Sequence, residues 1–253
     1  MIVKDITNFL EVQAPLSLQE SYDNSGLIIG HPEQEIDATL FCLDVTEDIV
    51  DEAVEKGCNL IVAHHPLIFG SLKRLNAEDH VERAVMKAIK HDVAIYAAHT
   101  NLDNVASGVN NKIAEKLGLE HCEILRSKTG VLKKLVTFCP NMNSETGEYY
   151  PGIIRQALFN AGAGKIGNYD QTTFNIQGKG TFRAPDDSAP FVGEKARMHV
   201  QDEIRIETVF PGYLQSQIIK TLVEAHPYEE VAYDVYPLDN AFVPTGSGMI
   251  GHL

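Results

Sequence analysis

The chain has 253 residues, of which 44% are hydrophobic and 22% charged, an ordinary globular composition that allows one or two domains. Its formal net charge of −14 argues against a broad nucleic-acid-binding face, because phosphate recognition relies on clustered Lys and Arg. No apolar run is long enough to span a bilayer, the first residues do not read as a signal peptide, and the four cysteines have no C-x-x-C spacing. We therefore expect a cytoplasmic protein with reduced thiols and no membrane partner.

The first half of the chain alternates apolar strands with amphipathic helices, beginning with a helix at the N-terminus. Continuous apolar runs rich in β-forming residues predict three strands: 39–45, 59–63 and 93–98. Apolar residues at helical spacing predict three further helices: 47–56, 78–91 and 107–117. Repeated βαβ units with fully apolar strands imply an α/β domain, whose parallel sheet is covered on both faces.

The pattern changes after about residue 128. Four strands are expected there: 133–138, 171–183, 198–210 and 231–238. Two helices lie between them: 151–161 and 212–225. The resulting order, βαββαβ, is that of an α+β ferredoxin-like domain. We place the first domain at 1–128 and this second domain at 129–240.

Residues 241–253 are rich in Pro and Gly and are expected to form a linker. After them no further element follows, and a three-stranded parallel sheet would leave an edge strand without a partner. We interpret the first domain as unfinished, so that either another chain completes it or the sequence stops where its second half begins.

Two neighbouring histidines, His64 and His65, come where the second predicted strand ends. In open parallel sheets, ligands bind beyond the carboxyl ends of the strands. Adjacent residues of a regular strand point to opposite sides, so the pair fits two ions. It fits one ion only if the turn at Pro66 rotates the rings together.

A second polar cluster follows the third predicted strand, at 98–104. Asp103 offers a carboxylate that can chelate or bridge metal ions, and His99 and Thr100 are predicted to orient the ligands by hydrogen bonds. A strand-to-helix loop with an Asx cap is the alternative. Two such clusters at the ends of consecutive strands favour the metal site.

Other polar residues are open to two interpretations. Asp44, at the end of the first predicted strand, either orients a ligand or caps the next helix. Tyr22 and Asp23 either line the pocket or belong to a turn. Residues 225–230, AHPYEE, are the most site-like feature of the second domain, although a structural turn is the favoured interpretation.

These motifs resemble the Nif-three-like family, often labelled GTP cyclohydrolase I type 2 homologues. The matching stretches in the first domain are YDNSGLIIG (22–30), DVTEDIVDEA (44–53), AHHPLIF (63–69) and AHTNLDN (98–104). Those in the second are GKIGNYDQTTF (164–174), GKGTFR (178–183) and AHPYEEVAYDVYPL (225–238). The second domain is similar to the PII/CutA-like insertion domain of longer family members.

The resemblance implies a dinuclear site on the inner face of a toroidal homohexamer. His64 and His65 would bind different divalent ions, and Asp103 would be a further ligand. The family also takes a His and a Glu from a segment after the insertion, and the sequence ends at Leu253 before such residues. Histidine with carboxylate suits zinc, iron, manganese or nickel.

The resemblance further implies a metal-dependent hydrolase that opens the imidazole ring of a purine nucleotide such as GTP, with no catalytic residue assigned. The alternative is a non-enzymatic, metal-responsive scaffold with a PII-like ligand sensor, and a third reading is an assembly module with a vestigial site. The chain has no GxxxxGK[ST] motif, which argues against a P-loop nucleoside triphosphatase.

Overall fold

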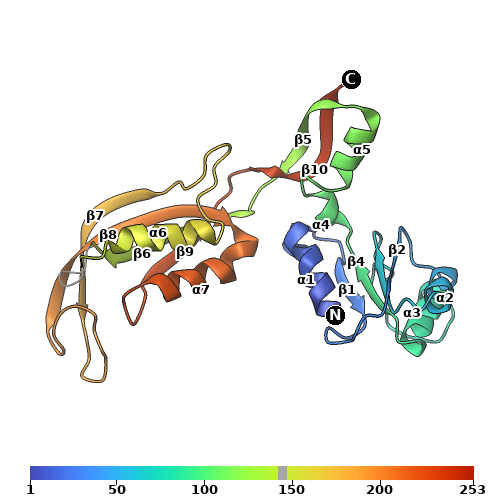
Figure 1. The fold of residues 1–253 in the computed structure, drawn as a ribbon, viewed down its shortest axis with the longest axis horizontal. Helices are drawn as coiled ribbons and strands as arrows, with labels where there is room; N and C mark the ends of the chain where they lie inside the picture. Colours follow the sequence, from blue (N-terminus) through green and yellow to red (C-terminus); the bar gives the residue numbers. More distant parts are fainter. Residues whose placement is uncertain (142–146) are drawn as a thin grey trace. The chain divides into compact units, whose positions relative to one another are not determined.

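The computed structural model describes residues 1–141 and 147–253. The chain forms two compact units (Figure 1): unit 1 comprises Met1–Ser127 and Pro244–Leu253, and unit 2 comprises Lys128–Val243. Each unit has hydrophobic core clusters of its own. Among the described residues, no helix is long and apolar enough to cross a membrane.

Unit 1 contains a four-stranded sheet in the order β1-β4-β3-β2. Its strands are β1 (Gly26–Ile29), β2 (Thr39–Cys42), β3 (Leu60–Ala63) and β4 (Ala94–Ala97). Strands β2, β3 and β4 are parallel, in keeping with the three apolar runs, whereas β1 pairs antiparallel with β4. We had not predicted β1, because its four residues follow a turn-forming segment and are too few to show a period.

Helices cover both faces of this sheet. Unit 1 contains α1 (Val3–Gln13), α2 (Glu47–Glu55), α3 (His80–Lys90), α4 (Thr100–Asp103), α5 (Val109–Leu117) and a 3₁₀ turn, η1 (Leu16–Leu18). Along β3, Ile61 shares a core cluster with residues of α2 and α3, whereas Leu60 and Val62 share another with Val3 of α1. Successive side chains of β3 therefore pack in two different cores, one on each face of the sheet, which explains its continuous apolar sequence.

Residues 241–253, expected to be a linker, instead form strand β10 (Phe242–His252), which pairs with β5 (Glu120–Lys128) in a two-stranded sheet. Gly246 has a φ of +156°, and a Cβ there would lie 2.0 Å from the carbonyl oxygen of Arg126. The glycine thus permits close approach of two backbones. Close approach of the two strands, rather than a linker, therefore explains a glycine at this position.

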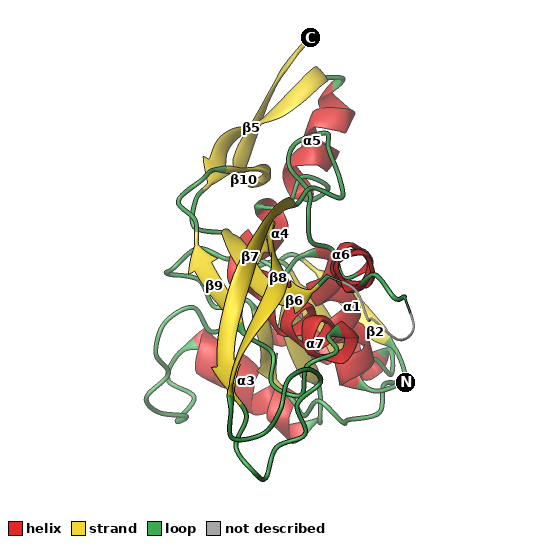
Figure 2. Ribbon diagram, turned by 90° about the vertical axis from the view of Figure 1, so that its left-hand side faces the viewer, coloured by secondary structure: helices red, strands yellow, loops and turns green. Residues whose placement is uncertain are grey.

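Unit 2 has the predicted βαββαβ order. Its elements are β6 (Leu132–Pro140), α6 (Tyr150–Asn160), β7 (Phe174–Arg183), β8 (Met198–Pro211), η2 (Gly212–Leu214), α7 (Gln215–Ala225) and β9 (Tyr233–Pro237). The sheet order is β7-β8-β6-β9, and each neighbouring pair is antiparallel. Figure 2 shows β7 and β8 as long adjacent strands. Ile154 of α6, Leu222 of α7 and Ile206 of β8 belong to one buried cluster, so both helices pack on one face of the sheet.

Candidate metal centre

Three histidines gather at the carboxyl edge of the sheet in unit 1. His64 and His65 directly follow β3, and His99 lies just beyond β4, the parallel neighbour of β3. The ring centroids are 4.9 Å apart for His64 and His65, 5.3 Å for His64 and His99, and 5.4 Å for His65 and His99. One potential ligand atom from each ring lies within 4.8 Å of the other two. The chain bends after Ala63, and the two neighbouring imidazoles therefore face a common space.

Each of these imidazoles is oriented through its Nδ1 atom. The Nδ1 of His64 lies 2.8 Å from the carbonyl oxygen of Ala98, which can only accept a hydrogen bond. The Nδ1 of His65 lies 2.7 Å from Oδ1 of Asp44, and the Nδ1 of His99 lies 2.7 Å from Oδ1 of Asp23. All three Nδ1 atoms therefore donate, and in each neutral ring the Nε2 atom keeps its lone pair for a metal ion.

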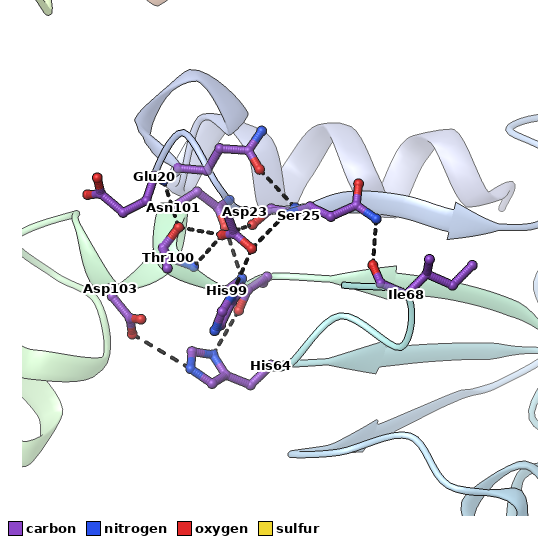
Figure 3. Close-up of polar contacts among 12 residues, drawn as sticks. Glu20, Asp23, Ser25, His64, Ile68, His99, Thr100, Asn101 and Asp103 are labelled. Atoms are coloured by element: carbon purple, nitrogen blue, oxygen red, sulfur yellow. Dashed lines mark hydrogen bonds and ion pairs between the residues drawn. The ribbon is translucent and has the colours of Figure 1, made fainter. Parts of the chain in front are cut away.

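Asp103 brings a carboxylate to the same cluster. Its Oδ1 atom lies 3.7 Å from Nε2 of His64 (Figure 3). This separation is too long for a hydrogen bond and is close to the roughly 3.4 Å expected between two ligands of one tetrahedral ion. Asp103 is the last residue of α4, which is a single turn of helix. The backbone N–H of Asp103 donates to the carbonyl oxygen of His99 at 3.1 Å. The turn therefore ties the carboxylate to the histidine loop.

The buried carboxylate of Asp23 anchors this loop on the side of His99 away from His64 (Figure 3). Its side chain has no solvent exposure, and it accepts hydrogen bonds from His99, from the backbone N–H and hydroxyl of Thr100, from Asn24 and from Ser25. Burial by itself raises the pKa of Asp23, but the bonds from His99, Thr100, Asn24 and Ser25 outweigh it and hold the pKa below its usual range. Asp23 therefore stays ionised and favours a proton on Nδ1 of His99.

Two amides fasten the loop to the N-terminal segment. Asn101 Nδ2 donates to the carbonyl oxygen of Ala14 at 2.7 Å, and Asn104 Nδ2 donates to that of Leu18 at 2.8 Å. Both asparagines are buried. The loop is thus part of the packed structure, which favours a preformed site.

The structure brings the sequence-predicted residues to one place. His64 lies beside both His65 and Asp103, Asp44 contacts His65, and Thr100 contacts Asp23. His99, predicted to orient ligands, has its ring among the other two. Asp23, for which a turn and a pocket role had been left open, supports the cluster from a distance of 76 residues along the chain.

At the carboxyl edge of this α/β sheet, three imidazoles of fixed tautomer lie beside a carboxylate, and such a group of side chains could hold a metal ion. The family model of DUF34/NIF3 (NGG1p interacting factor 3) matches residues 1–250. The chain belongs to this family, and the resemblance drawn from the motifs is confirmed.

Curated relatives carry the name GTP cyclohydrolase 1 type 2 homolog. The protein of Halalkalibacterium halodurans is 41% identical over 249 residues, which cover 98% of this chain and 65% of that protein. The protein of Bacillus subtilis is 41% identical over 251 residues, which cover 99% of this chain and 65% of that protein. The chain therefore spans slightly less than two thirds of the length of these relatives.

Solved structures of relatives share the fold. The crystal structure of a Bacillus cereus protein related to NIF3 matches with a TM-score of 0.80 at 43% identity, covering 99% of this chain and 65% of that one. A Staphylococcus aureus protein matches with a TM-score of 0.65 at 30% identity, covering 98% of this chain and 63% of that one.

Proposed function

We propose that unit 1 is the metal-binding part of a dinuclear, divalent-metal-dependent hydrolase. The observation that carries this proposal is the convergence of His64, His65 and His99, each with Nδ1 facing an acceptor, so that Nε2 carries the lone pair of the neutral ring. Neutral imidazole with carboxylate suits zinc, iron or manganese. The donor chemistry of these residues therefore fits the metal that the resemblance implies.

The residues that would hold an ion are His64, His65 and Asp103, with His99 beside them. By the resemblance, His64 and His65 would bind different ions and Asp103 would be a further ligand, and the remaining donors would come from elsewhere, such as the implied His and Glu. When bound, ions of this kind supply hydroxide at neutral pH by lowering the pKa of bound water. The chain's own contribution is to hold each ring in one tautomer through Asp23, Asp44 and the Ala98 carbonyl oxygen.

A purine nucleotide is the proposed substrate, and its ring opening is the proposed reaction. The support is the name GTP cyclohydrolase 1 type 2 homolog borne by the relatives. We further propose that the protein is cytoplasmic and forms a homo-oligomer, which the resemblance implies is a hexamer. Its two domains would lie at 1–128 and 129–240. Its second domain is a ferredoxin-like, PII/CutA-like insertion, in keeping with the βαββαβ order and the sheet order of unit 2.

The alternative is a non-enzymatic, metal-responsive scaffold in which unit 2 senses a ligand. Metal analysis and nucleotide turnover separate the two, using the protein of full natural length loaded with zinc, iron or manganese. We expect stoichiometric metal, GTP turnover, and loss of both in His64→Ala, whereas His31→Ala, at an exposed histidine, keeps both. Tight metal binding without turnover of any nucleotide would favour the scaffold, and absence of retained metal would refute both proposals.

A further inference from the structure

Unit 2 contains a cavity of about 590 Å³ that the metal centre does not use. Strands β7 and β8 form part of its wall, the AHPYEE turn at 225–230 forms another part, and the segment 184–192 between the two strands forms a third. Small-molecule sites in proteins have volumes of roughly 300–1,000 Å³. The cavity therefore has the size of a ligand site.

Two charged side chains of β8 lie on the face of the sheet opposite the helices. Ile204 and Ile206 point into the buried cluster under α6 and α7, so Glu203 and Arg205, which alternate with them, point from the other face. In the β7–β8 ladder, Gly178 lies opposite Glu203. Residues directly opposite each other share a face, so Gly178 adds no side chain to the cavity that it lines, and the Glu203 carboxylate lies over Gly180 of the same strand.

Aromatic rings form the apolar part of the wall: Phe138, Phe182, Phe191 and Tyr228. The ring of Phe191 lies 6.1 Å from that of Tyr228, and 5.5 Å from that of Tyr150 in an edge-on contact. The segment 184–192 is fixed by a hydrogen bond of 2.8 Å from the backbone N–H of Ala189 to Oε2 of Glu229. These contacts hold the wall in place without a ligand.

Arg205 offers unused donors to this cavity. Its guanidinium lies 5.9 Å from the centre of the Phe138 ring, and its Nε is 2.9 Å from Oε1 of Glu207. That contact is an ion pair without hydrogen-bond geometry, since the buried Nε finds no acceptor within the part of the chain that the structure describes. A guanidinium has five N–H donors in a planar fork, which suits a carboxylate. Arg205 therefore marks an anion-binding end.

Carboxylates give the cavity the opposite charge. Glu203 accepts a hydrogen bond of 2.9 Å from the hydroxyl of Tyr228, and Glu229 and Glu230 also line the cavity. The lysine of the wall, Lys179, is already paired with Asp202 at 2.7 Å on the surface. Over residues 1–141 and 147–253, no ion pair joins these three glutamates to a cation of the chain. They are available to an ammonium group.

We infer that this cavity binds a small molecule that carries an ammonium and a carboxylate on an apolar body, the class of α-amino acids with large apolar side chains. Glu203 and Arg205 are two positions apart on one strand, about 6.8 Å between backbone positions. Two opposite charges on one carbon can bridge such a pair while the side chain contacts the aromatic wall. This site lies outside the metal centre and does not depend on the proposed hydrolase activity.

Calorimetric titration of the whole chain with L-phenylalanine and L-leucine tests the inference. We expect binding of these amino acids, and at least tenfold weaker binding of phenylacetate and phenethylamine, each of which lacks one of the two charges. Arg205→Gln and Glu203→Gln should each weaken binding about tenfold or more, whereas Lys220→Gln on α7 should leave it unchanged. Failure of all apolar amino acids to bind at millimolar concentration, or equal binding of the single-charge analogues, would overturn the inference.

A filled cavity provides a second test that does not alter any charge. A Cβ at Gly178 would meet no atom within 4 Å, and the residue has no unusual backbone conformation, so Gly178→Val fits the fold and places atoms in the cavity that this residue lines. We expect an unchanged thermal unfolding midpoint, unchanged metal content and lost amino-acid binding. Retained binding in this variant would show that the ligand lies elsewhere.

Discussion

Asp23 shows at the scale of single residues how this site is held. Its ionised, buried carboxylate contacts the ring of His99 and the backbone of the next residue, so it fixes both a tautomer and a loop. Asp44 makes the same kind of contact with His65, although it is more exposed. Hydrogen-bond partners of metal-binding histidines commonly tune affinity.

Replacing Asp23 with asparagine tests this role. The amide keeps an acceptor but turns an N–H₂ group toward donors, so the loop loses its anchor and His99 loses a negative partner. We expect Asp23→Asn to bind zinc about 10–100-fold more weakly in competition with a chromophoric chelator. Asp37→Asn, in an exposed position, serves as the control. Equal zinc affinity of the two variants would contradict the anchoring role.

His226 gives a pH dependence to unit 2. Burial lowers the pKa of this imidazole below its ordinary value of 6.5, despite the hydrogen bond of its Nε2 to the carbonyl oxygen of Phe138. The unfolded chain therefore binds a proton more readily, and stability falls as the pH drops below about 6.5, by at most about 1.4 kcal/mol per pH unit.

We expect His226→Gln, which keeps a donor to Phe138, to lose less stability than the parent protein between about pH 7 and pH 5 in urea unfolding. The exposed variant His31→Gln should behave as the parent. Equal losses in all three proteins would show that His226 does not contribute.

The difference between what could and could not be predicted is clear at these residues. His64, His65 and Asp103 follow predicted strands, and parallel pairing alone brings strand ends together. Asp23 lies in a short turn far from His99 in the sequence, so nothing in its local pattern indicates the contact. That the ring of His99 lies beside those of His64 and His65 could not be predicted, because a bend after a strand cannot be deduced from periodicity.

Among the secondary-structure elements, strand β10 could not be predicted from its local sequence either. Continuous apolar runs of strand length identified the buried strands of unit 1, because both faces of a parallel sheet require apolar residues. Strand β10 has Pro244 and several glycines, which are typical of loops, and only its fit against β5 explains them. Strand β1 was missed because four residues carry too little pattern.

Gly246→Ala tests whether β10 depends on close backbone approach. The added Cβ would lie 2.0 Å from the carbonyl oxygen of Arg126, at a φ of +156°. We expect loss of amide-exchange protection in β5 and β10, measured by hydrogen-exchange mass spectrometry. Gly118→Ala is the matched control, because its φ is +72° but no atom lies within 4 Å of the Cβ, so it carries only the conformational cost of about 1–2 kcal/mol. Full protection in the first variant would disprove the steric argument.

At the scale of the whole molecule, the chain has two units with separate hydrophobic cores. A ligand stabilises the unit that binds it, by about 2.7 kcal/mol at a concentration of 100 times Kd. We expect calorimetric unfolding in two transitions. Zinc should raise the midpoint of one and L-phenylalanine that of the other. A single transition raised by both ligands would show that the units unfold together.

The pairing of β5 with β10 also has a topological consequence. Unit 2 occupies one continuous stretch of sequence, and Ser127 and Gly246, on either side of it, lie against each other within unit 1. When the chain enters and leaves a domain at adjacent points, the whole domain can be inserted or removed while the other unit keeps its fold. Splicing a tight hairpin turn between these two strands would thus give a minimal scaffold for engineering the histidine cluster alone.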